Sequence, residues 1–136
     1  VAQQPNKRQF IGAWRLDSML VDGTAMQLHA ESFIYLNRKG VYAGYATTYL
    51  GEHEISALGE WELKHDTLWI MGDDFANGFT FSWVGEGRLK LTTYSSDPEP
   101  ERKDSYFTSV TGNEKLIETE IEYYKSRNTP SWSVRN

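Results

Sequence analysis

The chain lacks cysteine altogether, and several other chemical signals are missing with it. Without cysteine there is no disulfide framework, no thiolate metal site and no cysteine nucleophile. The three histidines, His29, His53 and His65, stand on separate segments without metal-ligand spacing, so we predict neither a metal site nor a cofactor. No G-x-S-x-G nucleophile elbow is present either, and the sequence therefore assigns no catalytic residue.

Long apolar runs and an excess of basic residues are also absent. No stretch approaches the roughly 18 apolar residues that a transmembrane helix requires. The 14 lysine and arginine residues stand against 19 aspartate and glutamate residues, which makes a net charge of −5. This balance argues against a nucleic-acid or anionic-membrane binder, because both need a basic patch.

The length of 136 residues indicates a single domain, residues 1–136, which is large enough to bury a core without metals or disulfides. Within it we expect residues 1–9 to form an N-terminal stub and residues 126–136 a C-terminal tail. The first residue is Val1, and the polar segment after it is typical of what remains once a signal peptide has been removed. We therefore expect an exported protein, periplasmic or at the cell surface. A lipidated cysteine upstream of Val1 stays an open alternative.

Aromatic residues are plentiful, at 14% of the chain, and apolar residues alternate with polar ones between turn signals. Trp61 and Leu63, for example, alternate with Glu60 and Glu62. A period of two indicates β-strands with one buried and one solvated face. Combinations of Gly, Asn and Asp, which favour tight turns, separate these segments. The pattern predicts strands at about residues 13–20, 31–37, 41–49, 55–64, 67–72, 78–84, 88–94, 103–110 and 116–125.

The last of these segments, NEKLIETEIEYYKSR, fits two interpretations. As a strand it turns Ile117, Ile121 and Tyr123 to one side and its glutamates to the other. As a helix it places Leu116, Ile117, Ile121 and Tyr124 on one stripe. We favour the strand because of its β-branched residues and regular alternation. Helix is then expected only as a short turn at about residues 6–11.

Sequential antiparallel strands joined by short turns form a meander, and closing the meander into a barrel removes its exposed edges. We therefore predict an all-β fold, an antiparallel up-and-down barrel of eight to ten strands with at most a short N-terminal helix. Gly12 lets the first strand bend or approach another segment closely. Trp14, two residues later, can then close the floor of the barrel.

Gly12-Ala13-Trp14 resembles the G-x-W signature of the lipocalins and the wider calycin superfamily. A strand ending in NRKG, a second G-x-W that begins at Gly59, and the later segment GRLKLTTY follow in order. This series is similar to the lipocalin-like domains of exported bacterial proteins, over about residues 8–125. The resemblance implies the barrel fold and brings no catalytic residues with it. It also implies an arginine packed on Trp14, for which Arg127 is the nearest candidate.

The strongest functional feature is a set of large aromatic side chains expected on the inner face of the barrel. Such rings supply apolar area, and tyrosine and tryptophan add a polar group that can orient a ligand. They are also the rings that would simply fill a small barrel. The candidate ligand-binding residues are Phe33, Tyr35, Tyr42, Trp61, Phe79, Phe81, Trp83, Tyr106 and Tyr123.

Three functions remain open at this point. The first is non-enzymatic binding of a small apolar or aromatic molecule in the barrel interior. The second is a carbohydrate-binding or accessory role in a saccharide-utilisation system, for which aromatic rings beside acidic loops are suited. The third is a small barrel enzyme with an interior general acid or base. None of these identifies the ligand or the oligomeric state.

Overall fold

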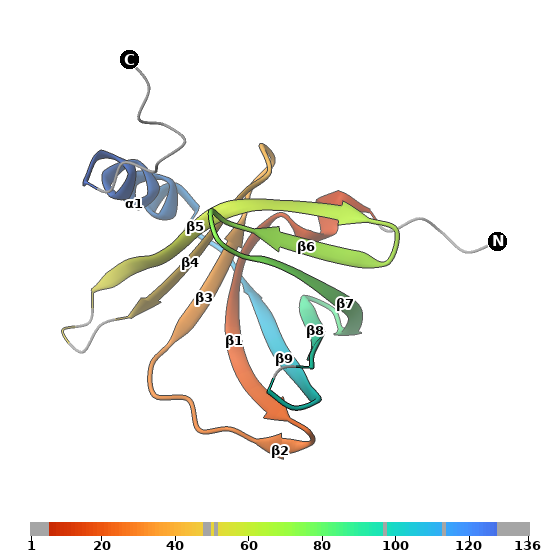
Figure 1. Cartoon of the computed structure of the whole chain (residues 1–136). Helices are drawn as coiled ribbons and strands as arrows, with labels where there is room; N and C mark the ends of the chain where they lie inside the picture. Colours follow the sequence, from red (N-terminus) through yellow and green to blue (C-terminus); the bar gives the residue numbers. More distant parts are fainter. Residues whose placement is uncertain (1–5, 48–49, 51, 97, 113, 128–136) are drawn as a thin grey trace.

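Eight antiparallel strands close into a barrel in the computed structural model, which describes residues 6–47, 50, 52–96, 98–112 and 114–127 (Figure 1). Each strand pairs with the next along the chain, and the first also pairs with the last, which closes the sheet. The predicted all-β, up-and-down barrel is thereby confirmed. The eight are β1 (Gly12–Val21), β3 (Ser32–Leu36), β4 (Val41–Thr47), β5 (His53–Lys64), β6 (Thr67–Met71), β7 (Ala76–Gly85), β8 (Arg88–Ser95) and β9 (Glu101–Val110).

The turns between the strands lie where the sequence places its Gly, Asn and Asp residues. Asp22 and Gly23 both have positive φ, and they reverse the chain from β1 into the two-residue β2 (Thr24–Ala25). Gly40 and Gly87 take positive φ in the turns that follow β3 and β7. Glycine adopts this backbone conformation without steric cost, so these hairpins form locally.

Apolar side chains from all around the barrel meet in one interior cluster. Its buried members are Phe10, Trp14, Leu36, Trp61, Leu68, Ile70, Leu89, Leu91 and Phe107. Alternate residues along the same strands belong to a second cluster on the outside. Ala13 precedes Trp14, for example, and Phe33 and Tyr35 precede Leu36. The strand period of two therefore separates an inner from an outer apolar layer.

A short 3-10 helix, Lys7–Phe10, closes one end of the barrel, as the sequence predicts for residues 6–11. Phe10 is fully buried, and its carbonyl oxygen accepts a hydrogen bond of 3.0 Å from the indole Nε1 of Trp14. The other G-x-W tryptophan, Trp61, donates from its Nε1 to the carbonyl oxygen of Asn37 at 2.9 Å. Both rings thus fill the floor with their polar groups satisfied.

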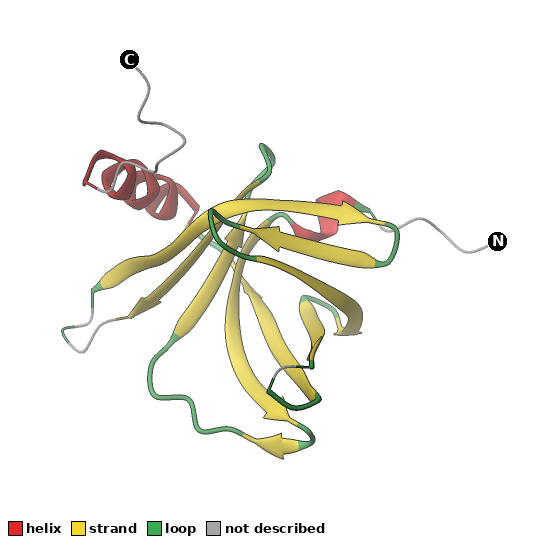
Figure 2. Cartoon of the chain, in the orientation of Figure 1, coloured by secondary structure: helices red, strands yellow, loops and turns green. Residues whose placement is uncertain are grey.

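The last element is a helix, α1 (Glu114–Arg127), and the predicted strand at residues 116–125 is wrong (Figure 2). Ile117 and Ile121 are buried four residues apart, and Tyr124 packs against the same cluster, so the helical stripe is the pattern that the fold uses. The expectation of no helix beyond a short N-terminal one is therefore corrected. Helix α1 also includes Ser126 and Arg127, the first two residues of the expected C-terminal tail. Residues 128–136 lie outside the described part.

Candidate functional site

The inner face of the barrel is not uniformly buried. Leu16, Ile34, Tyr42, Phe79 and Phe81 pack against the interior cluster but are only partly buried. The ring of Phe81 lies 4.9 Å from that of Phe10 between centroids, and Phe81 also lines a hollow on the outer side of β7. Figure 1 shows the strands spreading apart toward the end that carries β2. We call the partly buried set of the inner face, which packs on the buried floor, the calyx: Leu16, Ile34, Tyr42, Phe79 and Phe81.

The middle of this calyx is shaped by small residues. A Cβ atom placed on Gly44 would lie 2.8 Å from the Tyr42 hydroxyl and 3.5 Å from the Cβ of Ala57. The three residues thus share the inner face, and the Tyr42 hydroxyl lies over Gly44. Burial raises the pKa of this hydroxyl, so it keeps its proton at neutral pH and can donate a hydrogen bond to a ligand.

Four of the nine predicted ligand-binding residues belong to the interior cluster: Tyr42, Trp61, Phe79 and Phe81. Trp83 packs on the closed end, with its ring centroid 5.1 Å from that of Phe10 and 5.9 Å from that of Trp14, and it is 37% exposed.

The other four are not on the inner face, so the prediction of one shared cavity is corrected. Phe33 and Tyr35 lie in the outer cluster beneath α1. Tyr106 stands between the inward Ser105 and Phe107, and Lys90 lies over its ring at 5.7 Å. Tyr123 is on α1 and 56% exposed.

Arg127, the candidate for packing on the first-strand tryptophan, lies instead over the ring of Tyr123 at 5.4 Å. A different cation contacts the ring of the second G-x-W tryptophan: the Nζ of Lys7 lies 5.0 Å from the ring centroid of Trp61. The Arg127–Tyr123 pair is therefore local to α1, whereas the Lys7–Trp61 pair joins the N-terminal segment to β5.

Three further residues lie on the inner face but were not among the residues predicted from the sequence: Leu16, Ile34 and Ala57. Leu16 and Ile34 are apolar residues on predicted strands, so they were visible as candidates. A β-bulge between Leu16 and Ser18 changes the face that later β1 residues occupy, and a second irregularity lies between Gly44 and Tyr45. Counting by two along these strands therefore fails beyond each bulge.

Beneath α1, tyrosine hydroxyls connect the barrel wall to the helix. Tyr35 donates a 2.6 Å hydrogen bond to Glu118, which also accepts one of 3.2 Å from the side-chain amide of Asn37. The Phe33 and Tyr45 rings stack with centroids 4.7 Å apart. The Tyr45 hydroxyl is buried and has no hydrogen-bond partner within the described residues. This outer layer explains why β3 and β4 are apolar on both faces.

Raising the pH above 10 is expected to destabilise the protein, because burial raises the pKa of Tyr45 to about 12, with Glu114 adding to it. Unfolded tyrosines lose their proton near pH 10 while folded ones retain it, so the stability present below pH 10 is lost toward pH 12. The loss amounts to at most about 1.4 kcal/mol per group and pH unit. Urea unfolding between pH 8 and pH 11.5 measures it. Tyr45→Phe should give a shallower slope, and an unchanged slope would contradict the assignment.

A polar hollow of about 330 Å³ lies outside the barrel on β7, β8 and β9. Asp104, which is 3% exposed, accepts hydrogen bonds from Thr92 at 2.6 Å and from Arg102 at 3.1 Å. The exposed ring of Tyr94 lies at its edge.

Among the described residues, no three metal-ligating side chains lie close enough together to hold a metal ion. None of the helices in this part of the chain is long and apolar enough to cross a membrane.

Eight sequential strands, a short helix beneath Trp14 at the closed end and one helix after the last strand make up this architecture. The fold is lipocalin-like. No protein-family model matches the lipocalin-like chain, and no curated protein matches its sequence.

Among solved structures, bovine odorant-binding protein in complex with its natural ligand is similar at 11% identity and a TM-score of 0.48, covering 100% of this chain and 94% of its own. The bovine lipocalin allergen Bos d 2 is similar at 10% identity and a TM-score of 0.47, over 95% and 92% of the two chains. Apocrustacyanin C1 follows at 13% identity and a TM-score of 0.49, over 96% and 78%. These likenesses concern the overall architecture alone.

Proposed function

We propose that this lipocalin-like barrel binds a small apolar or aromatic molecule in its calyx. The observation that carries the proposal is the partial exposure of inward-pointing apolar side chains. On the inner face Leu16, Ile34, Phe79 and Phe81 are each only partly buried. A ligand that covers this surface gains about 25 cal/mol for each Å² of apolar area removed from water. The Tyr42 hydroxyl supplies one polar contact for orientation.

The test is to fill the calyx and measure the loss of binding. Ala57→Phe places a ring beside Tyr42 and Gly44, and we expect at least a tenfold loss of affinity for N-phenyl-1-naphthylamine, followed by probe fluorescence. Undecanal, which one solved complex of bovine odorant-binding protein contains, serves as a competing probe. Ile34→Phe is an independent second filling variant.

Thr80→Phe is the matched control, because Thr80 is exposed on the outer face of β7 between the inward Phe79 and Phe81. It adds the same ring outside the barrel, and we expect affinity within twofold of the unmodified protein. Unchanged affinity in folded Ala57→Phe and Ile34→Phe proteins would rule out the interior as the binding site. Circular dichroism reports whether each variant is folded.

The two alternative functions find different support. A saccharide would use the polar hollow with Tyr94 and Asp104 rather than the calyx, and calorimetric titration with a panel of oligosaccharides tests it. An interior general base is disfavoured at Tyr42, because its raised pKa keeps the proton on the oxygen.

Export to the periplasm or cell surface stays a proposal that rests on the polar N-terminal segment.

A further inference from the structure

Strand β5 has a free edge over half of its length. It pairs with β4 from His53 to Glu60, but its ladder with β6 begins only at Glu60. Met71 at the end of β6 still lies against Gly59, so within the described part of the chain residues 53–58 have a neighbouring strand on one side only. Unpaired N–H and C=O groups along such an edge are a template for pairing with another extended chain.

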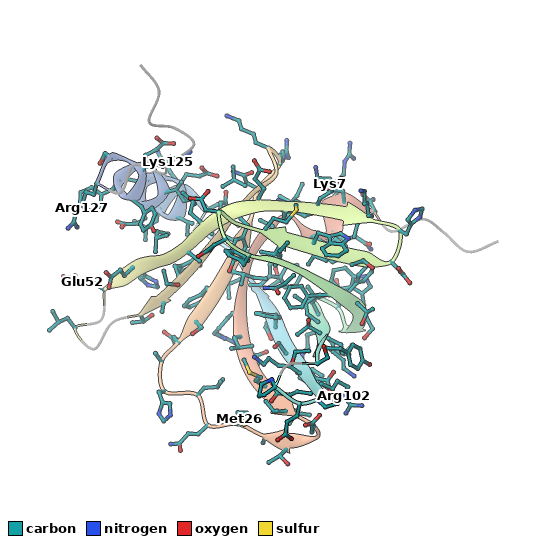
Figure 3. All side chains as sticks on the ribbon, in the orientation of Figure 1. Lys7, Met26, Glu52, Arg102, Lys125 and Arg127 are labelled. Atoms are coloured by element: carbon teal, nitrogen blue, oxygen red, sulfur yellow. The ribbon has the colours of Figure 1, made fainter. Side chains whose placement is uncertain are left out.

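Helix α1 runs beside this edge. Its buried stripe, Ile117 and Ile121, belongs to the outer cluster with Tyr45 and Ile55. An adjacent stripe of the helix, which includes Leu116, Glu120, Tyr123 and Arg127, lines a groove of about 780 Å³ against the start of β5. Figure 3 shows Arg127 at the end of α1 on the same side of the molecule as Glu52 at the start of β5.

The floor of the groove is the strand edge itself. His53, Glu54 and Ile55 all line it, although successive side chains of a strand point to opposite faces. Three consecutive residues can share one groove only where it follows the strand's backbone. A helix wall above a free strand edge is the arrangement that accepts a peptide as an added strand.

The groove also presents groups that its own chain does not satisfy. Leu116 is 53% exposed and Tyr123 is 56% exposed on the helix wall. The buried Tyr45 hydroxyl, without a hydrogen-bond partner among the described residues, borders a small pocket of about 10 Å³ at the base. A bound partner could cover the two exposed side chains and form a hydrogen bond with the Tyr45 hydroxyl.

Charge indicates which kind of peptide the groove accepts. The carboxylates of Glu54 and Glu120 line it together with one guanidinium, that of Arg127, which lies over the Tyr123 ring. The whole chain carries a net charge of −5, so long-range attraction also favours a basic partner.

We propose that an extended segment of a partner protein, with lysine or arginine alternating with apolar residues, adds to the β5 edge as a strand beneath α1. Its backbone pairs with residues 53–58. Its apolar side chains cover Leu116 and Tyr123, and its basic side chains lie near Glu54 and Glu120. This surface is separate from the calyx, so a peptide and an interior ligand bind independently.

The test uses octapeptides that alternate Lys or Arg with Val, Ile or Leu, titrated by calorimetry, with amide hydrogen exchange as a second readout. We expect binding together with slower amide exchange in residues 53–58. The same peptides N-methylated at their four central amides keep their side chains but cannot pair as strands, and we expect them not to bind. Peptides with Glu in place of Lys or Arg should bind at least tenfold more weakly.

Two charge variants on one helix locate the contact. Glu120→Lys should weaken peptide binding at least fivefold, because Glu120 lines the groove. Glu122→Lys makes the same charge change two residues away, outside the groove, and should leave the affinity within twofold. Ile34→Phe, which fills the calyx from β3 and lies outside the β5 edge, should leave peptide binding unchanged, so this proposal and the interior site fail separately.

Three results would overturn the proposal. One is the absence of binding by every peptide in the set. Another is binding that survives N-methylation or that Glu120→Lys and Glu122→Lys weaken equally, since either shows general charge attraction. The third is protection of residues 53–58 that rises with protein concentration without peptide, because the edge then pairs with a second copy of this chain.

Discussion

Gly59→Ala is expected to lower the free energy of unfolding by about 3 kcal/mol or more, or to prevent folding altogether. A Cβ atom at this position would lie 2.0 Å from the carbonyl oxygen of Met71, 3.0 Å from its carbonyl carbon and 3.2 Å from the Cα of Gly72. All three are backbone atoms at the end of β6, and they cannot move without breaking the β5–β6 ladder. Urea unfolding followed by circular dichroism measures the loss.

Gly44→Ala is the control for this prediction, since it adds the same methyl group to the neighbouring strand. Its nearest obstacle, at 2.8 Å, is the hydroxyl of Tyr42, the far end of a side chain that can rotate away. We expect a loss of about 1 kcal/mol or less there. If Gly59→Ala cost no more than Gly44→Ala, the close approach of Met71 would not be what requires glycine in the second G-x-W.

The second large effect is expected for Trp14→Ala, at about 3–5 kcal/mol of unfolding free energy. Trp14 is 3% exposed, and truncation would leave a cavity in the floor beside Phe10. Trp14→Phe keeps an aromatic ring but removes the Nε1 donor from the Phe10 carbonyl. Leaving that buried oxygen unpaired should cost about 1–3 kcal/mol. Denaturant unfolding by circular dichroism measures both variants.

Trp83→Ala is the comparison for Trp14→Ala. Trp83 contacts the same two rings, those of Phe10 and Trp14, but it is 37% exposed. Less apolar area is therefore returned to water on truncation, and we expect a smaller loss, about 1–2 kcal/mol. Equal losses for the two variants would show that the closed end does not depend on the buried G-x-W ring.

Both signature glycines are explained by backbone geometry, yet for different reasons. Gly12 has a φ of +133°, and nothing lies within 4 Å of the position that its Cβ would take, so conformation alone requires glycine there. Gly59 is required by the approach of Met71. The sequence predicted a bend or a close approach at Gly12 without distinguishing the two. Neighbouring residues in the sequence specify neither the φ angle nor the distance to a carbonyl group of another strand.

The sequence by itself determined the strands, the turns and the closed meander. Period-two alternation and left-handed turn residues act over a few positions, and closure follows from the need to pair every edge. Its error at residues 116–125 arose because Ile117 and Ile121 satisfy both a period of two and a helical stripe. The choice between strand and helix depends on the apolar outer surface of β3, β4 and β5, which this segment covers as a helix.

Only the tertiary structure decided which aromatic side chains point into the barrel. Phe33 and Tyr35 are as apolar as the residues of the inner layer, and only α1, more than 70 residues later, makes their face an interior one. Bulges in β1 and between β4 and β5 shift the inward face by one residue, which local alternation does not record. The free edge of β5 is likewise a property of strand lengths in the assembled sheet. Composition and periodicity determine that each strand has two different faces. Packing against distant segments determines whether a face contacts the barrel core, helix α1 or solvent.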